Sequence, residues 1–226
     1  MVKWCPSKSA EIVPKINRAS ESIVGSGDDD GEQNEVAASR WKCLCLGLGR
    51  PTSSIESRAQ LCLLLDLCAE LNITPGDTDL FDPAFEDADV AGLNDLGLRL
   101  MSENNKGAYV INTPTLVFMP HCDVELYERF FRANWSGDAL ARVLLVANDL
   151  QLYIDSTPVR KLEARSPCVA KLAPRLESTL FPPSTALPGA FNNTALQVLI
   201  TNGDKHAWTW ALPPDMEDGS DGSEVR

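Results

Sequence analysis

His121 and Cys122 stand together where an apolar segment, 115–119, gives way to a helical pattern beginning at Asp123. A histidine ring acts as a general acid or base near neutral pH, and a thiol becomes a nucleophile when a helix start lowers its pKa. Alternatively, His121 and Asp123 cap the first turn of the helix while Cys122 is buried as a small apolar residue. A zinc site would need about four ligands, and only these three residues are local. The sequence leaves the ligand contact, the helix cap and the metal open.

The segment GLGRPTSS, between the first predicted strand and the first predicted helix, offers a second candidate. Gly47 and Gly49 fit the first two positions of a dinucleotide fingerprint, whereas Thr52 takes the place of its third glycine. Pro51 removes a backbone N–H that could have faced an anion. Ser53 begins the following helix, at an end where such folds bind phosphates. The segment predicts either a small-molecule site or a turn that lets the helix approach the sheet.

Asp82 follows the second predicted strand, where nucleotide-binding folds place an acid that contacts the ribose hydroxyls. It lies 35 residues after Gly47, farther than the roughly 20 residues of the usual fingerprint. The alternative is that Asp82 and Pro83 form the turn into the next helix through the aspartate's own backbone hydrogen bonds. Both interpretations remain open at this point.

Short β-rich segments alternate with helical ones from residue 41 onward. The strands are apolar throughout rather than at alternate positions, a pattern of parallel sheets that are covered on both faces. We therefore predict an α/β fold, a Rossmann-like three-layer sandwich with a mostly parallel sheet and an antiparallel edge strand at 194–201. The first helix is expected to open with a capping box at Ser53 and Glu56. The other predicted strands are 41–47, 77–83, 98–102, 115–119 and 142–149, and the predicted helices are 53–71, 85–97 and 123–135.

Acidic flanks bound the predicted domain. Residues 1–38 and 213–226 lack sustained apolar periodicity and hold much of the formal charge of −12, so we expect both segments to be disordered. A single domain, 39–212, accounts for the rest of the 226 residues. Within this domain, residues 155–190 contain six prolines. The pattern of this segment does not predict where it lies relative to the sheet.

The composition narrows the classes of partner. An acidic chain disfavours nucleic acid, because attraction to phosphates dominates that binding. The longest apolar run, LCLLL, is far shorter than a membrane span, and the first residues lack the apolar region of a signal peptide. We expect an intracellular protein, cytoplasmic or nuclear, with reduced thiols and no membrane partner.

Several segments taken together resemble one family. They are LGLG with SRAQLCLLL, FDPAF, LGLRLMSENNKG, PTLVFMPHCDVELYERFFRANW and AFNNTAL. This set is similar to the sensitivity-to-red-light-reduced (SRR-like) family over residues 41–200, most specifically over 115–135. The resemblance implies a regulatory role, with circadian and light signalling and control of haem biosynthesis among the roles of the family, and it carries no assigned reaction. After the fifth strand the family shows Gly-Asn-Ser-Phe, and here only Asn148 matches.

We therefore predict one binding cleft at the carboxyl edge of the sheet, where α/β folds bind ligands. The predicted function is regulatory and non-catalytic, with protein partners, a small ligand and no metal, and the sequence does not identify the ligand or any cofactor. The alternatives are an enzyme, either a methyltransferase or an oxidoreductase that uses the cleft for its cofactor, and an interaction module whose cleft is filled by side chains. The predicted site residues are Gly47, Gly49, Ser53, Asp82, His121, Cys122 and Asn148.

Overall fold

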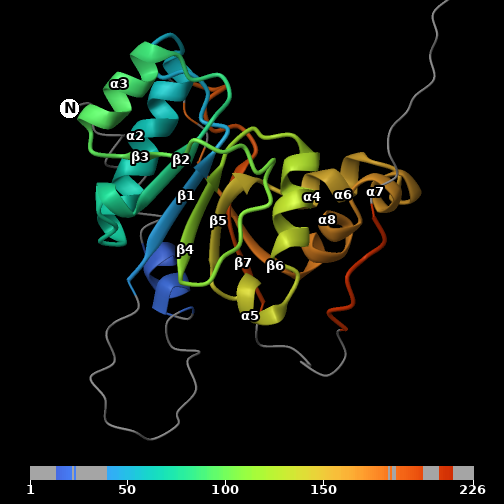
Figure 1. Ribbon diagram of the computed structural model, residues 1–226. Coiled ribbons are helices and arrows are strands. Elements are labelled where there is room, and N and C mark those ends of the chain that lie inside the picture. The colour runs from blue at the N-terminus through green and yellow to red at the C-terminus, as the bar shows by residue number, and fades with distance from the viewer. Residues whose placement is uncertain are drawn as a thin grey trace, which may run out of the picture.

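The computed structural model describes residues 14–21, 23, 40–182, 184, 187–200 and 209–215. Over these residues the protein is α/β, with one seven-stranded mixed sheet (Figure 1). The strands are β1 Lys42–Leu46, β2 Thr78–Phe81, β3 Arg99–Leu100, β4 Thr115–Met119, β5 Val143–Asn148, β6 Leu176–Leu180 and β7 Thr194–Leu199. The helices are α2 Ile55–Glu70, α3 Asp87–Asp95, α4 Val124–Ala133, α5 Gly137–Leu140, α6 Gln151–Ser156, α7 Val159–Arg165 and α8 Pro167–Leu172, with 3₁₀ turns η1 Pro75–Asp77 and η2 Ala173–Arg175.

The strand order in the sheet is β3-β2-β1-β4-β5-β7-β6. The first five strands in that order are parallel, β7 is antiparallel to β5, and β6 is antiparallel to β7. The chain builds outward from β1 to β2 and β3, and then returns to add β4 and β5 on the other side of β1. The order therefore reverses between β1 and β4, so the loops after these two strands diverge at the carboxyl edge, where such sheets bind ligands.

Helices cover both faces of the sheet (Figure 1). The side chains of β1 alternate between the faces, with Cys43 and Cys45 in one core and Leu44 and Leu46 in the other. The first core lies under α2 and α3, and the second lies under α4 and α8. Because the central strands are buried on both sides, the loops at the carboxyl edge start from fixed positions.

The proline-rich segment that could not be assigned from sequence folds into helices and an edge strand. Pro158 immediately precedes α7 and Pro167 begins α8, positions at which a helix needs no N–H donor. Past η2 the chain forms β6, which pairs with β7. The predicted antiparallel strand is present as β7, but its predicted place at the edge is wrong, because β6 covers its outer side.

Helix α2 begins one residue later than the predicted capping box. Its N-cap is Ser54, whose side chain accepts the N–H of Ser57 at 3.1 Å. Ser53 belongs to the preceding turn, because the N–H groups of Ser53 and Ser54 both donate to the carbonyl oxygen of Arg50. The predicted box at Ser53 and Glu56 is therefore wrong by one position.

A helix at 14–21 lies outside the predicted domain and packs onto it. Its Ile16 is fully buried in the first core, and Ile23, further on, joins the same cluster. The disorder expected for 1–38 therefore does not extend to these residues, and the rest of that segment lies outside the described residues. Ile16, Ala19 and Ile23 pack on this core at helical spacing, a short apolar pattern that the sequence prediction missed.

The C-terminal segment 209–215 also contacts the domain. Trp210 packs edge-on against Trp135, with ring centroids 5.6 Å apart. Arg132 donates to the carbonyl oxygens of Pro213 at 3.0 Å and Pro214 at 2.5 Å. The disorder expected for the acidic tail thus does not hold for its first residues, and residues 216–226 lie outside the described ones.

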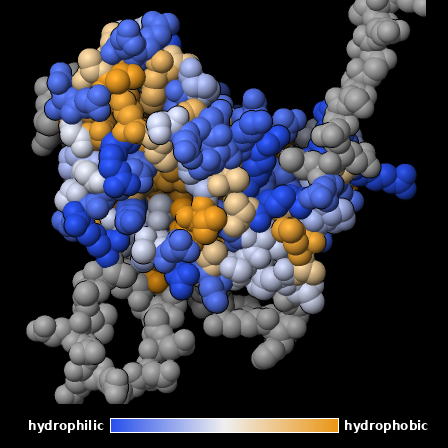
Figure 2. All heavy atoms as spheres, in the orientation of Figure 1, coloured by the Kyte–Doolittle hydropathy of each residue, from blue (hydrophilic) through white to orange (hydrophobic). Residues whose placement is uncertain are grey.

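The surface is largely hydrophilic on the face shown in Figure 2, where apolar residues form separate patches. One patch lies over α3, where Val90 and the following Leu96 are exposed. Within the described part of the chain, no helix has the length and apolar character that a membrane crossing requires.

Candidate functional site

Asp82 braces the loop after β1. Gly49 donates its N–H to Asp82 Oδ2 at 2.7 Å, and Asp82 Oδ1 accepts the N–H of Ala84 at 2.8 Å. Gly47 and Gly49 have φ values of +70° and +73°, which glycine adopts readily. The structure thus brings Gly49 and Asp82 together, and it favours the turn interpretation of Asp82, since both carboxylate oxygens already accept bonds from the protein.

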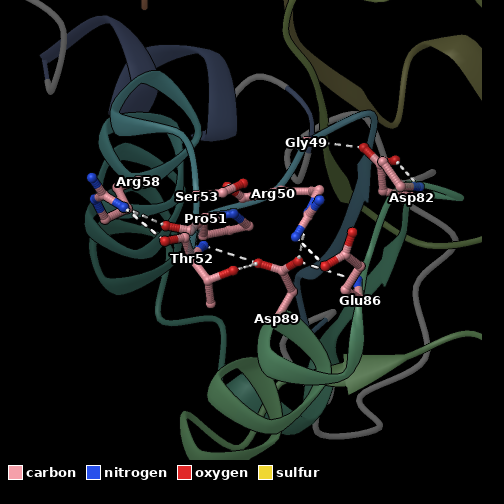
Figure 3. Close-up of polar contacts among 10 residues, drawn as sticks. Gly49, Arg50, Pro51, Thr52, Ser53, Arg58, Asp82, Glu86 and Asp89 are labelled. Carbon is pink, nitrogen blue, oxygen red and sulfur yellow. Dashed lines mark hydrogen bonds and ion pairs between the residues drawn. The ribbon is translucent and has the colours of Figure 1, made fainter.

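Asp89, near the start of α3, holds the same loop from the other side. Its Oδ1 accepts the N–H of Thr52 at 2.9 Å and the Thr52 hydroxyl at 2.6 Å, and its Oδ2 accepts the N–H of Glu86 at 3.1 Å. Arg50 forms ion pairs with Asp89 and Glu86 (Figure 3). Burial alone would raise the pKa of Asp89, but these hydrogen bonds outweigh it and lower the pKa to about 2. Asp89 is therefore an internal anion at neutral pH.

These carboxylates occupy the donors that a phosphate would use. In nucleotide-binding folds, free N–H groups of the glycine loop and the helix start bind the anion. Here the N–H groups of Gly49 and Thr52 are bonded to carboxylates, and that of Ser53 donates to the carbonyl oxygen of Arg50 at 3.1 Å. The Ser53 hydroxyl lies in this exposed turn, 3.5 Å from the same oxygen. The geometry favours a braced turn over a phosphate site.

His121 forms a tight corner after β4. Its φ of +54° lies in the left-handed region, which is costly for a residue with a Cβ. The N–H of His121 donates to Asn148 Oδ1 at 2.9 Å, and its Nε2 lies 3.1 Å from the carbonyl oxygen of Ala190. That oxygen also accepts a hydrogen bond from the buried Gln60 of α2. His121 therefore links β4 to β5 and to the segment before β7, while the residue itself remains exposed.

Cys122 is a buried thiol that packs against Gly47. A Cβ added at Gly47 would lie 2.4 Å from the Cys122 Sγ, so the two loops touch at this point. Burial, followed by the negative charges of Asp82 and Asp123, raises the pKa of Cys122 to about 12. A thiolate is therefore not populated near neutral pH, and the interpretation of Cys122 as a nucleophile with a lowered pKa is wrong. The buried-thiol part of the alternative is confirmed, but the N-cap Asp123 makes no side-chain cap bond.

Asn148 completes the junction between the loops after β4 and β5. Its Nδ2 donates to the hydroxyl of Tyr153 at 3.1 Å and lies 3.5 Å from the carbonyl oxygen of Cys122. Four of the predicted site residues thus meet, namely Gly47, His121, Cys122 and Asn148. Sequence reasoning missed Tyr153, because no motif marks a helix residue that contacts a distant loop. Hydrogen bonds and the contact between Cys122 and Gly47 thus hold the loops after β1, β4 and β5 together.

An open pocket of about 340 Å³ lies beside this junction and shares Gly47 with it. It sits where β1 and β2 end, under the connection between β3 and β4, and against the first turns of α4. Of the predicted site residues, only Gly47 lines it. Its lining is Leu46, Gly47, Phe81, Pro83, Asn104, Lys106, Gly107, Tyr109, Asp123, Glu125, Leu126 and Arg129. The fragment SENNKG lies within the segments that carry the family resemblance, but nothing in its composition predicts that it borders a pocket.

The connection that forms one wall of this pocket is held in place at several points. Gly107, with φ +91°, lies so close to α4 that a Cβ there would be 2.9 Å from the carbonyl oxygen of Leu126. Asn134 donates to the carbonyl oxygen of Tyr109 at 2.8 Å and accepts the N–H of Ile111 at 2.7 Å. The pocket is therefore formed by the folded chain before any ligand arrives, which lowers the cost of binding.

The candidate reactive groups at this edge are already engaged within the protein. The thiol of the junction is protonated, and the carboxylates of the glycine loop are engaged in internal bonds. Among the described residues, no group of three or more His, Cys, Asp and Glu side chains is arranged to hold a metal ion. What the edge offers is a pocket with an apolar floor and charged walls.

Fold and site define an α/β protein with a pocket at the carboxyl edge of its parallel strands, and sequence comparison gives the family. The SRR1 domain model matches residues 15–198, so the chain belongs to the SRR1 family. The match begins within the helix at 14–21 and ends in β7. No solved structure gives a significant match.

Three relatives illustrate the range of the family. The SRR1-like protein of Mus musculus is 32% identical over 76% of this chain and 71% of its own length. The Arabidopsis thaliana Protein SENSITIVITY TO RED LIGHT REDUCED 1 is 32% identical over 47% of this chain and 39% of its own length. The SRR1-like protein of Drosophila melanogaster is 26% identical over 49% of this chain and 40% of its own length. The chain therefore aligns with about two fifths of the length of the last two.

Proposed function

We propose that this protein is a regulatory member of the SRR1 family that binds a small molecule in the pocket between β1, β2 and α4. The observation that carries the proposal is the pocket itself, about 340 Å³ in volume and lined by both apolar and charged side chains. Small-ligand sites have volumes of about 300 to 1,000 Å³ and combine apolar walls with a few polar groups. The pocket also lies next to the point where the strand order reverses, the preferred place for ligands in open α/β sheets.

The strand order supports a finer description of the fold. The run β3-β2-β1-β4-β5 is the order of the first five strands of doubly wound nucleotide-binding sheets. We therefore interpret the protein as a Rossmann-like three-layer sandwich with an added antiparallel pair. On this interpretation the pocket has shifted to the α4 side, because the loop before α2 is filled by Asp82 and Asp89.

A regulatory role is favoured over a catalytic one by the state of the candidate reactive groups. The Cys122 thiol is protonated at neutral pH, and the His121 ring lies against a backbone carbonyl rather than beside a nucleophile. The name of the Arabidopsis relative refers to sensitivity to red light, which suggests a signalling context. A regulator that responds to a ligand acts on other proteins, so the proposal includes protein partners.

A cofactor-dependent enzyme, a methyltransferase or an oxidoreductase, is the second candidate. It is favoured by the strand order alone, which is shared with nucleotide-binding enzymes. The occupied donors of Gly49 and Thr52 count against a phosphate-bearing cofactor at the usual place. A cofactor would therefore have to bind in the α4 pocket.

Native mass spectrometry of the purified full-length chain tests the proposal. We expect a small molecule to remain bound, and we expect Glu125→Trp to lose it, because the indole fills the pocket from an exposed position on α4. Glu163→Trp, at an exposed position on α7 outside the pocket, is the matched control and should retain the ligand. A bound mass that turns over when substrate-like molecules are added would favour the enzyme. If the wild type and both variants all show only the mass of the protein without a ligand, ligand binding is contradicted.

A further inference from the structure

Four charged residues line the α4 pocket and are not used by the fold. Lys106 and Arg129 contribute two positive charges, and Asp123 and Glu125 contribute two negative charges. Within the described part of the chain, none of the four forms an ion pair, and all four are exposed. Elsewhere in the described chain, Arg40, Arg50, Arg99 and Arg132 each pair with a carboxylate.

Lys106 has a backbone conformation that is uncommon for a lysine. Its φ is +52°, in the left-handed region that asparagine and glycine tolerate better than lysine. Two of the other three non-glycine residues with positive φ are asparagines, Asn72 and Asn193. Asn104 and Asn105 precede Lys106 in the sequence, and asparagine is a residue type that tolerates this conformation. Strained positions of this kind often mark functional sites.

The two cations arise close together. Gly107, the residue after Lys106, is pressed against α4 so that a Cβ there would lie 3.3 Å from the Cβ of Arg129. Glu125 is one helical turn before Arg129, and Asp123 is the N-cap of the same helix. The wall formed by α4 therefore has an acidic end at the start of the helix and a basic end one turn further on, beside Lys106.

The floor of the pocket is apolar and partly aromatic. Leu46 and Phe81 come from the ends of β1 and β2, and Pro83 follows β2. Tyr109 stands on the opposite connection, fixed by its hydroxyl, which donates to the carbonyl oxygen of Glu103 at 3.1 Å. A flat or branched apolar group can pack between these side chains, where it removes apolar surface from water.

We propose that the pocket binds a small zwitterion of the amino-acid type, with an apolar or aromatic body, one anionic group and one ammonium group. The apolar body lies on Phe81, Pro83 and Tyr109. The anionic group lies against Lys106 and Arg129, and the ammonium group faces Asp123 and Glu125. This inference rests on the proposed function, since it assigns a ligand class to the same pocket.

A ligand of a single sign fits the pocket less well. The four charges sum to zero, so an anion attracted by Lys106 and Arg129 is repelled by Asp123 and Glu125, and the reverse holds for a cation. A zwitterion satisfies both pairs at once, and complementary charges of this kind set specificity more than raw affinity. Because the charges are exposed, salt screens the contacts, and the preference should weaken as ionic strength rises.

Three related probes test the class by titration calorimetry on the full-length chain. They are phenylalanine, 3-phenylpropionate, which lacks the ammonium group, and 2-phenylethylamine, which lacks the carboxylate. We expect phenylalanine to bind about three- to tenfold more tightly than either analogue, the range set by two exposed ionic contacts. Equal affinity for phenylalanine and 3-phenylpropionate, or no measurable binding of any probe at millimolar concentration, would overturn the zwitterion class.

Charge-neutralising variants place the probe in the pocket. Lys106→Asn should weaken phenylalanine and 3-phenylpropionate about threefold or more and leave 2-phenylethylamine unchanged or tighter, whereas Glu125→Gln should do the reverse. Arg160→Gln, at an exposed position on α7, is the control and should change none of the three. Equal effects of all variants would overturn the assignment.

The native mass spectrum separates this failure from that of the proposed function. If no probe binds but the full-length chain still carries a small molecule that Glu125→Trp loses, the pocket is a ligand site and only the zwitterion class is wrong. If no probe binds and the purified protein carries no small molecule, both the zwitterion class and the proposed ligand site are wrong.

Discussion

Two loops at the same edge of the sheet use charge in opposite ways. In the loop between β1 and α2, the N–H groups of Gly49 and Thr52 donate to carboxylates from elsewhere in the chain. Asp82, after β2, accepts the bond from Gly49, and Asp89, in α3, accepts the bond from Thr52. In the α4 pocket, by contrast, the described residues offer no ion-pair partner to Lys106. The first loop carries the glycine pattern that suggests a cofactor, yet the N–H groups of Gly49, Thr52 and Ser53 are already bonded within the protein. The comparison teaches that glycine spacing alone does not show whether the N–H groups of a loop are free to bind a ligand.

The largest effect is expected where the braced loop loses its internal anion. Asp89→Ala removes the acceptor of three hydrogen bonds and leaves Arg50 without its buried partner, so we expect a loss of about 3 to 5 kcal/mol in the free energy of unfolding. Glu86→Gln, whose side chain is 61% exposed, should cost less than about 1 kcal/mol. Urea unfolding of both variants gives the comparison, and similar small losses would show that the loop does not depend on Asp89.

The next largest effect on stability is expected where the loop after β1 contacts the loop after β4. Gly47→Ala combines an unfavourable left-handed residue with a Cβ only 2.4 Å from the Cys122 Sγ, and we expect it to cost about 2 to 4 kcal/mol. Cys122→Ala removes the sulfur, so the double variant should recover part of the loss measured for Gly47→Ala. A double-mutant cycle by chemical unfolding measures this recovery. Strict additivity of the two single changes would contradict the packed junction.

Acid titration tests the braced loop in another way. The pKa of Asp89 falls from 3.8 to about 2 in the folded protein, so its contribution to stability is present above about pH 4 and is lost as the pH falls toward 2. The shift corresponds to at most about 2 kcal/mol. Asp89→Asn should remove this part of the pH dependence, so its free energy of unfolding should fall less than that of the wild type between pH 4 and pH 2. Parallel curves would mean that Asp89 titrates normally.

The smallest effect on stability is expected in the pocket. Lys106→Asn keeps a residue that tolerates the left-handed conformation, and Lys106→Ala does not. We expect the asparagine variant to be equal to the wild type or more stable by up to about 1 kcal/mol, and the alanine variant to be no more stable than the wild type. Thermal unfolding of the pair decides the point. A large loss in Lys106→Asn would show that the lysine serves the fold.

Sequence periodicity predicted the central elements because their surroundings are uniform. The strands β1 and β4 are apolar on both sides, and α4 has a strong apolar face, so their types followed from local pattern. β6 was missed because all five of its residues, beginning with Leu176, are exposed or half-buried and alternate irregularly. The start of α2 was placed at Ser53 instead of Ser54 because adjacent serines are equivalent in a capping pattern. The position of β7 inside the sheet followed from β6 and could not be known without it.

The candidate site was predicted in part, and for a physical reason. Parallel strands bring their carboxyl ends together, so the approach of Gly47 to Cys122 and of Gly49 to Asp82 could be expected from topology. Whether such groups meet a ligand or one another depends on side-chain packing, which a sequence does not show. The α4 pocket was missed because its residues come from separate segments that only folding brings together.

One measurement tests the central contrast most directly, the native mass spectrum of the wild type beside Lys106→Asn and Thr52→Val. Thr52→Val breaks the hydroxyl contact to Asp89 and lowers stability, yet we predict that it retains the bound small molecule of the wild type. Lys106→Asn should carry a clearly smaller share of that molecule, in line with an about threefold or greater loss of affinity, while its free energy of unfolding is unchanged or higher. The opposite pattern, with the ligand lost from Thr52→Val and retained by Lys106→Asn, would place the binding site in the glycine loop and contradict the account.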